Sequence, residues 1–434
     1  MPHQVHLSAF MLFAPAPHTP LSWLSAPTDV EHQWFEAGYW RAIARTLERG
    51  KFDMLFLADS LAGGNTPAQI RYAIQFPCHD PVALVTYLAG VVEKLGLAVT
   101  MSTTFYPPFL LARTLATLDH LTAGRIGWNI VSSISSAEAR NFGRAELPPH
   151  DQRYDLADEY LAACHALWNS WDDDAVVMDV NQKIFADPNK VHRVAFQSEH
   201  FQTEGPFTVI PSPRRHPFLF QAGQSERGRA FAARHAEGIF SAARGTHQMR
   251  AFSDDIAARL EGGGRDPATV PILWAAQPVV AATEAEARDR FAEIRERIPL
   301  EASIAQMSAH WDVDLNGADI DQPVVELQVS GLQGFVDMYV RAQPEITLRD
   351  IAGSYMVGSG RSPLIGTPAQ VADAMLGMLE EGGGSGFQIS PPYHAPAYFN
   401  DLVEMLIPEL RKRGLYRDDY CGTTLAEHVR EGMA

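Results

Sequence analysis

Cysteine is scarce in this chain: Cys78, Cys164 and Cys421 are its only cysteines in 434 residues, and no two of them form a C-x-x-C pair. Neither a disulfide framework nor a cysteine-ligated metal is therefore expected. The 16 histidines include no H-E-x-x-H pattern, so we expect no metal centre. The chain also lacks a Walker sequence, a G-x-S-x-G elbow and a G-x-G-x-x-G fingerprint. These absences disfavour a P-loop nucleotide site, a serine hydrolase and a nicotinamide site.

Basic residues are also fewer than acidic ones, with 35 Lys and Arg against 52 Asp and Glu. The formal net charge of −17 argues against nucleic acid or an anionic membrane surface as a partner. No apolar stretch is long enough to span a bilayer. The start of the chain, residues 1–6, lacks a basic region followed by an apolar run, so we expect no signal peptide. Together these features predict a cytoplasmic location.

Hydrophobic residues make up 46% of the chain, and many of them fall into eight short runs typical of buried strands. Helical patterns follow most of these runs, which favours a parallel sheet. Eight such units predict a closed (β/α)₈ TIM barrel, and an open doubly wound sheet is the alternative. The predicted strands are residues 5–10, 54–58, 97–101, 126–131, 218–220, 238–240, 272–276 and 387–389.

The whole chain, residues 1–434, is interpreted as a single barrel domain, because no linker rich in Pro, Gly or Ser divides it. Two segments, near 133–215 and 299–363, are too long for one loop and one helix. We expect these insertions at the carboxyl-terminal face of the barrel, where they would roof a site.

Polar side chains gather where the predicted strands end. Asp59 follows the apolar strand 54–58, and either accepts a hydrogen bond from a ligand or caps the next helix. Thr100 belongs to a row of hydroxyls that either faces a ligand or reflects ordinary strand propensity. Asn129 and Ser133 lie at the tip of the strand 126–131. Because α/β folds build sites at the carboxyl ends of their strands, these residues are binding candidates.

A second group of candidates precedes or begins helices. Ser225, in the run Gly223 to Gly228, lies between a strand and a helix expected over about 229–236. It fits a phosphate cradle, or a plain N-cap. His150 and Tyr154 are four residues apart, before a helix expected from near residue 155, and either donate to a phosphate or form a surface turn. His310, in the second insertion, is either solvated or a catalytic acid or base.

Several motifs in order along the chain resemble those of one enzyme family. They include Asp119-His120-Leu121-Thr122-Ala123-Gly124-Arg125-Ile126-Gly127-Trp128-Asn129, His150-Asp151-Gln152-Arg153-Tyr154-Asp155, Gln221-Ala222-Gly223-Gln224-Ser225-Glu226-Arg227-Gly228 and Gly366-Thr367-Pro368-Ala369-Gln370-Val371. This ordered set resembles the nitrilotriacetate monooxygenase family. That family is a branch of the bacterial-luciferase-like flavin monooxygenases, which also contains dibenzothiophene sulfone and long-chain alkane monooxygenases.

The resemblance implies a TIM barrel with an FMN site at its carboxyl-terminal face. By the matched positions, Asp59, Thr100, Asn129 and Ser133 would lie near the isoalloxazine ring. His150, Tyr154 and Ser225 would hold the phosphate and ribityl chain, and His310 would lie on the substrate side as a catalytic candidate. The sequence also suggests Phe10, Phe56, Phe105 and Trp128 as candidate pocket walls.

The implied reaction is that of a two-component monooxygenase. A separate NAD(P)H:FMN reductase would supply reduced FMN (FMNH₂), which would react with O₂ to form a C(4a)-(hydro)peroxide and oxygenate a small organic substrate. Relatives are commonly dimers or tetramers, so a homo-oligomer is expected. Ile134 stands where some relatives carry a histidine, and no cysteine occurs near the N-terminus as it does in the alkane enzyme. The substrate is therefore left open, with a preference for an apolar or sulfur-containing compound. The alternatives are a deazaflavin-dependent oxidoreductase and a non-catalytic flavin-binding protein.

Overall fold

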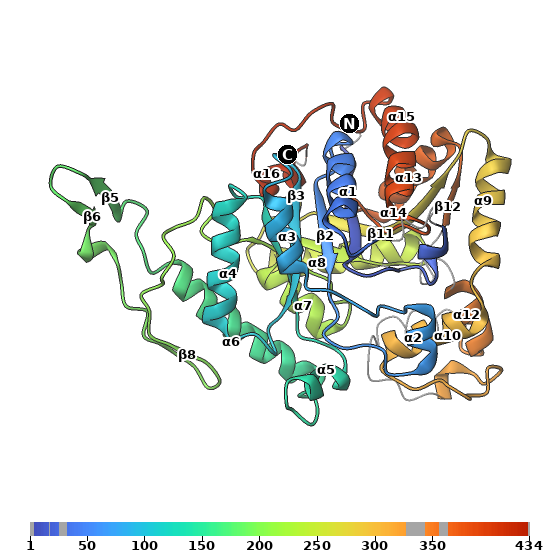
Figure 1. Ribbon diagram of the computed structural model, residues 1–434, viewed down its shortest axis with the longest axis horizontal. Coiled ribbons are helices and arrows are strands. Elements are labelled where there is room, and N and C mark those ends of the chain that lie inside the picture. The colour runs from blue at the N-terminus through green and yellow to red at the C-terminus, as the bar shows by residue number, and fades with distance from the viewer. Residues whose placement is uncertain (1–3, 17, 26–32, 327–342, 356–362, 433–434) are drawn as a thin grey trace.

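The chain folds around a closed barrel of eight parallel strands, as the computed structural model shows (Figure 1). The structure describes all residues except 1–3, 17, 26–32, 327–342, 356–362 and 433–434. Each of the eight predicted strands is confirmed, and pairing of β10 with β11 closes the ring. The barrel strands in chain order are β1 (His6–Leu12), β2 (Met54–Ala58), β3 (Gly96–Ser102), β4 (Ile126–Val131), β9 (Phe218–Gln221), β10 (Gly238–Ser241), β11 (Ile272–Val280) and β13 (Gly386–Ile389).

Helices surround the barrel, and their boundaries follow local capping signals. Ser225 accepts a hydrogen bond from the Gly228 N–H at the start of α7, and Thr367 forms a capping box before α13. The α-helices around the barrel are α1 (Ala37–Arg49), α3 (Pro81–Ala89), α4 (Pro108–Leu121), α6 (His150–Trp168), α7 (Glu226–His235), α8 (Thr246–Gly262), α13 (Pro368–Gly382), α14 (Ala395–Asp401) and α15 (Ile407–Lys412). Short helical turns are η1 (Ser22–Ser25), η3 (Pro188–Lys190), η4 (Pro267–Thr269) and the π-helical η7 (Leu402–Leu406). In the described part of the chain, no helix is long and apolar enough to cross a membrane.

The inside of the barrel is packed with side chains that alternate along the strands. Phe10, Phe56 and Phe220 form its apolar interior, whereas neighbours such as Leu55 belong to the layer between strands and helices. The C-terminal helix α16 (Leu425–Arg430) joins this interior cluster through Leu425. A Cβ on Gly96 would lie 2.5 Å from Leu425 Cδ1, so α16 packs directly against the strand backbone at the amino end of the barrel.

A fully buried ion pair holds this C-terminal segment in place. Arg417 Nη2 donates to Asp53 Oδ1 at 2.7 Å and to the His428 carbonyl at 2.8 Å. His6 Nδ1 lies 3.1 Å from the same carboxylate oxygen, and the Leu7 N–H donates to Oδ2 at 2.8 Å. Burial alone would raise the pKa of Asp53, but the charges of Arg417 and His6 hold it below its usual range.

The first insertion divides into two parts. Residues 132–149, with α5 (Ser136–Asn141), leave the carboxyl end of β4 and remain at the rim. Residues 169–217 instead connect the end of α6 to the start of β9 and extend away from the barrel (Figure 1). They form two antiparallel hairpins, β5 (Val176–Asp179) with β6 (Ile184–Ala186) and β7 (Phe196–Gln197) with β8 (Gln202–Thr203). Of the segment expected to roof the site, only the first part contributes.

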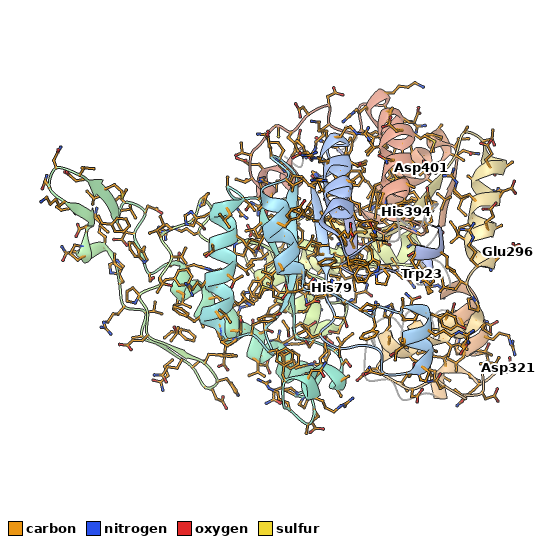
Figure 2. All side chains as sticks on the ribbon, viewed as in Figure 1. Trp23, His79, Glu296, Asp321, His394 and Asp401 are labelled. Atoms are coloured by element: carbon orange, nitrogen blue, oxygen red, sulfur yellow. The ribbon has the colours of Figure 1, made fainter. Side chains whose placement is uncertain are left out.

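Helix α9 (Glu284–Glu296) follows β11, and the second insertion, near residues 299–363, comes after it. The insertion contains α10 (Leu300–Trp311), η5 (Val324–Glu326) and α12 (Leu348–Tyr355), and it ends at β12 (Pro363–Gly366). Residues 327–342 and 356–362 of this insertion lie outside the described residues. β12 extends the sheet by pairing with the far end of β11. α10 packs on α2 (Pro67–Tyr72), where the Tyr72 hydroxyl donates to Glu301 at 2.6 Å. Arg290 of α9 binds Asp401 of α14 at 2.7 Å, and Figure 2 labels Asp401 among the side chains around the barrel.

Replacing Asp53 by Asn should lower the free energy of unfolding by about 3–5 kcal/mol, because Arg417 would lose its fully buried counterion and be left with Glu431, a partly exposed carboxylate 3.1 Å from its Nε. The depressed pKa of Asp53 stabilises the native state above the unfolded-state pKa of about 4, and this contribution is lost as the pH falls through the folded-state pKa. Urea unfolding at pH 7 and at acidic pH measures both effects. Asp419→Asn, which removes an exposed carboxylate paired with Lys51, is the control and should change stability little. Equal stability of the two variants would contradict this role for Asp53.

Candidate functional site

A cavity of about 460 Å³ opens at the carboxyl-terminal end of the barrel. This volume suits a small-molecule ligand. Strand ends, the loop after β4, the α2 region and the end of α10 contribute to its wall. The lining residues include Phe10, Asp59, Gln75, Ser135, Glu138, His310, Asp312 and Val313.

Asp59 lies in the wall of this cavity directly after β2. Its Oδ1 accepts a hydrogen bond from the Ser60 N–H at 2.8 Å and lies 3.8 Å from Cys78 Sγ. Burial, with smaller contributions from the charges of Asp80 and Glu138, raises the pKa of Asp59 to about 7. Near neutral pH this carboxyl group can therefore either donate or accept a hydrogen bond. Raised pKa values of this kind are common at functional sites.

His310, near the end of α10, reaches the same cavity from the second insertion. Its Nε2 lies 2.7 Å from Nε2 of Gln75. Asp312 accepts hydrogen bonds from the Ser135 hydroxyl at 3.0 Å and from the Ser136 N–H at 3.3 Å, and so joins the two insertions over the cavity. Sequence reasoning did not identify Gln75, because its contact with His310 spans 235 positions and has no local signal.

Three predicted side chains, Thr100, Asn129 and Ser133, meet at the tips of β3 and β4, together with Ser102. Asn129 Nδ2 donates to Thr100 Oγ1 at 2.9 Å, and the hydroxyls of Ser102 and Ser133 lie 2.9 Å apart. Oδ1 of Asn129 is buried and has no hydrogen-bond partner among the described residues. Thr100, Asn129 and Ser133 are buried and are not among the residues that line the cavity.

The three candidates for a phosphate site form one cluster. Ser225 Oγ lies 3.3 Å from His150 Nε2 while it caps α7, and Tyr154 stacks edge-on against His150 with ring centroids 5.2 Å apart. The sequence predicts that α6 begins near residue 155, but the helix begins at His150, after Pro149. His150 and Tyr154 therefore lie one turn apart on a formed helix and not in a preceding turn.

Glycine is required where the chain passes from β9 into α7. A Cβ on Gly223 would lie 2.7 Å from the Tyr154 hydroxyl and 2.8 Å from the Gly228 Cα. A Cβ on Gly228 would lie 2.8 Å from the same hydroxyl. The turn between β9 and α7 is thus packed backbone to backbone at the N-terminus of α7. The free N–H groups and the dipole at a helix N-terminus favour a bound anion.

Arg153, beside this cluster, is a site residue that sequence reasoning passed over. Its side chain is buried, its Nε has no hydrogen-bond partner, and it forms no ion pair within the described part of the chain. Burial lowers its pKa, although the negative charges of Glu138 and Asp312 act in the opposite direction. A buried guanidinium with no ion pair is costly unless an anion binds it. The only signal in the sequence was the position of Arg153 between the candidates His150 and Tyr154.

Of the four aromatic residues suggested as pocket walls, only Phe10 lines the cavity. Phe56 packs deeper inside the barrel, where its ring is 5.6 Å from that of Phe220. Phe105 stacks on Phe142 with centroids 4.4 Å apart. Trp128 faces the helices and donates its indole N–H to the Met101 carbonyl at 3.0 Å. The suggestion was wrong for these three, because the direction of a side chain depends on strand alternation and loop packing.

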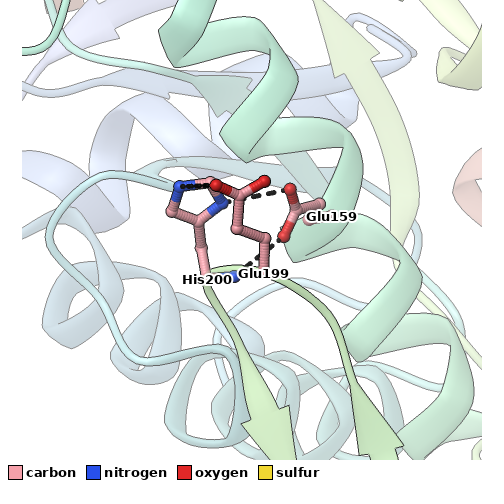
Figure 3. A group of neighbouring side chains, drawn as sticks. All are labelled: Glu159, Glu199 and His200. Atoms are coloured by element: carbon pink, nitrogen blue, oxygen red, sulfur yellow. Dashed lines mark hydrogen bonds and ion pairs between the residues drawn. The ribbon is translucent and has the colours of Figure 1, made fainter.

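One group of side chains among the described residues has metal-ligand spacing: Glu159, Glu199 and His200 (Figure 3). The His200 Nδ1 lies 3.1 Å from Glu159, and its Nε2 lies 3.9 Å from Glu199. Both ring nitrogens thus already face carboxylates. The group behaves as a partly exposed ion-pair cluster on α6 and the β7–β8 hairpin.

Comparison with known proteins relates the whole chain to flavin-linked oxygenases. The profile of the luciferase-like monooxygenases matches residues 10–386. Dibenzothiophene-sulfone monooxygenase of Rhodococcus erythropolis (strain XP) is 38% identical over 439 residues, covering 98% of this chain and 96% of that protein. The crystal structure of a long-chain alkane monooxygenase has a TM-score of 0.89 at 35% identity, covering 99% of this chain and 96% of that one. A riboflavin lyase, solved with modified FMN and riboflavin, has a TM-score of 0.92 at 30% identity, with coverage of 98% and 96%.

Replacing Asp59 by Asn should make the free protein more stable above pH 7, by on the order of 2 kcal/mol, because burial disfavours the ionised carboxylate. A carboxyl whose pKa is raised on folding destabilises the native state above its unfolded-state pKa, and the cost is complete above the folded-state value. The gain should therefore disappear near pH 4. Urea unfolding across this pH range measures it, and Asp418→Asn at an exposed position should show no such trend. A stability gain that does not vary with pH would contradict the raised pKa.

Proposed function

The chain belongs to the luciferase-like monooxygenase family, and on this basis we propose that it oxygenates a small organic substrate with O₂ and reduced FMN. Reduced FMN would supply the electrons that activate O₂, and a separate NAD(P)H:FMN reductase would provide it. Dependence on a separate reductase fits a chain with no nicotinamide fingerprint. We further propose a homodimer or homotetramer that acts in the cytoplasm. The observation that carries the cofactor assignment is the buried guanidinium of Arg153, which forms no ion pair with any described residue and which interacts electrostatically with Tyr154 of the Ser225 cluster.

The phosphate of FMN fits the cluster at the start of α7. Ser225 and Tyr154 can donate hydroxyl hydrogen bonds, and His150 can donate from its ring. Arg153 would provide the positive charge that a phosphate needs, and the anion would in turn compensate the buried guanidinium. Glycine at positions 223 and 228 lets the Tyr154 hydroxyl approach the start of α7 closely, so that this hydroxyl and the N–H groups of the helix N-terminus could bind the same phosphate.

The flavin ring fits between this cluster and the cavity. Asn129 has a buried Oδ1 without a partner, which can accept a hydrogen bond from a ring N–H. Thr100 orients the Asn129 amide, and Ser133 is held by Ser102 at the same strand tips. Asp59, on the cavity side, can donate to or accept from a ring heteroatom because its pKa is about 7.

The cavity itself would hold the substrate. His310, held against Gln75, would act as an acid or base at the reacting group, and the Asp312 contacts would keep water out. Phe10 and Val313 supply apolar wall, which suits an apolar or sulfur-containing compound. The named activities of the relatives, on a sulfone and on an alkane, support this substrate class.

The direct test is oxygen consumption by the purified protein with photoreduced FMN and candidate sulfur compounds, together with measurement of peroxide. A monooxygenase should convert a substrate and lower the peroxide yield in proportion to product. Peroxide yield unaffected by any substrate would favour a non-catalytic flavin-binding protein. Reaction with a reduced deazaflavin but not with reduced FMN and O₂ would favour the hydride-transfer alternative.

Ser225→Ala should weaken FMN binding by about 1–3 kcal/mol, because a hydroxyl bond to the charged phosphate is lost. Anaerobic titration with photoreduced FMN measures this. Ser225 also caps α7, so Thr283→Ala, which removes the cap of α9, is the matched control. Thr283→Ala should lose stability and keep its FMN affinity. Unchanged affinity in Ser225→Ala would remove Ser225 from the site.

Arg153→Gln should lower affinity for FMN about 10- to 100-fold and leave affinity for riboflavin nearly unchanged, because only FMN carries the phosphate. Flavin titration measures both affinities, and riboflavin is the internal control. Thermal unfolding of the ligand-free variant should show no loss of stability, since the substitution removes an uncompensated buried charge. An equal loss of affinity for both flavins would place Arg153 away from the phosphate.

A further inference from the structure

The wall of the cavity at the carboxyl-terminal end of the barrel carries more acidic than basic groups. Among the described residues, Arg140 is the only lysine or arginine in that wall, and it is exposed to solvent. His18 and His310 also line the wall, so that three cations at most are present there. The carboxyl groups of the wall are those of Asp59, Glu138, Asp312 and Asp314. A partly enclosed cavity lined mainly by one sign of charge holds a potential of that sign.

Neutral hydrogen-bond donors hold three of these carboxylates in place. Glu138 is 8% exposed and accepts the Leu61 N–H at 3.2 Å, together with two N–H groups just before its own helix. Asp312 accepts from a hydroxyl and an N–H of the facing loop, and Asp314 accepts the Asn316 N–H at 2.9 Å. A neutral donor orients a carboxylate without cancelling its charge, so these contacts leave the negative potential of the wall in place.

The buried cation Arg153 acts against this potential in the free protein, because it interacts electrostatically with Glu138 and Asp312. In the proposed function, the phosphate of FMN binds Arg153 and brings on the order of two negative charges of its own. Bound FMN would therefore leave the cavity no less negative. Asp59 agrees with a negative wall, since its pKa is raised to about 7 by burial and, to a smaller extent, by the charges of Asp80 and Glu138.

The rest of the wall is apolar and partly aromatic. The rings of Phe10 and Phe240 line the cavity, with their centroids 5.0 Å apart. Leu12, Ile134 and Val313 add aliphatic surface. Aromatic rings attract cations, and apolar walls receive the hydrocarbon or thioether part of a ligand. Carboxylates combined with aromatic and aliphatic surface suit an apolar body that carries a positive head group.

We propose that the substrate is an apolar or sulfur-containing compound with one protonated amine and no carboxylate, and that Asp312 and Asp314 select it by charge. Both residues follow His310 at the end of α10, on the side of the cavity assigned to the substrate, whereas Asp59 would face the flavin ring. An anionic compound of the same size would meet like charges in the cavity, which costs binding affinity. This inference rests on the proposed function for the place of the substrate, and it adds the charge that the substrate carries.

Binding of three sulfides that differ only in their head group tests this inference. The probes are CH₃SCH₂CH₂CH₂–X, where X is an ammonium, a hydroxyl or a carboxylate group. Each is titrated by calorimetry into the full chain, with and without saturating oxidised FMN. The ammonium compound should bind about tenfold more tightly than the alcohol, and the carboxylate should bind more weakly than the alcohol. Added salt should reduce the preference, because Asp314 is exposed to solvent.

Asp314→Asn should reduce the preference for the ammonium compound over the alcohol about threefold, and the double variant Asp312→Asn/Asp314→Asn should nearly abolish it. Asp319→Asn is the matched control. Asp319 is also exposed and accepts the N–H two positions ahead, from Asp321 at 3.0 Å, but it does not line the cavity. This control should bind the three probes like wild type. Unaltered far-UV circular dichroism would show that each variant is folded.

Equal affinities for the three probes, tightest binding of the carboxylate, or no binding of the ammonium compound would overturn the inference. A preference that survives in both Asp314→Asn and the double variant would overturn the assignment to these two residues. Oxygenation with photoreduced FMN separates this inference from the proposed function. Selective binding of the ammonium compound by a protein that oxygenates no substrate would contradict the proposed function alone. Oxygenation of the carboxylate in preference to the ammonium compound would overturn this inference alone.

Discussion

Closure of eight parallel strands into one hydrogen-bonded ring is the constraint on which the rest of this structure depends. Because every strand runs in the same direction, the residues that follow β2, β4, β9 and β10 must emerge at one rim. The opposite end is closed by α16, which the buried pair of Asp53 and Arg417 fastens to the barrel. The chain can therefore place polar and charged groups at one end without exposing its apolar interior at the other.

Two buried or half-buried charges at that rim lack the compensation that Asp53 has. Arg153 has no ion pair within the described residues, and the pKa of Asp59 is raised by its burial. Both features cost stability in the free protein, which is common where a site is organised for a ligand. In the proposed function, Arg153 would bind the phosphate and Asp59 would face the flavin ring from the cavity.

Different parts of the two insertions lie in different regions of the molecule. The loop after β4 and the end of α10 meet over the cavity through Ser135 and Asp312, so that the roof is built from segments far apart in the sequence. The part of the first insertion that follows α6 starts at the other end of the barrel and forms hairpins that contact no part of the cavity. One long segment thus contributes both to the wall of the cavity and to two hairpins that extend away from the barrel.

The sequence by itself determined the eight strands and the parallel barrel, and it offered Ser225 as a helix N-cap, because strand runs and caps depend on neighbours within a few positions. It also indicated the family, through motifs in order along nearly the whole chain. Only the tertiary structure decided that His310 meets Gln75, that Arg153 is buried with no ion-pair partner among the described residues, and that Phe105 and Trp128 lie outside the cavity. These features depend on contacts between distant segments and on the direction in which each side chain points, and local patterns of residues carry neither.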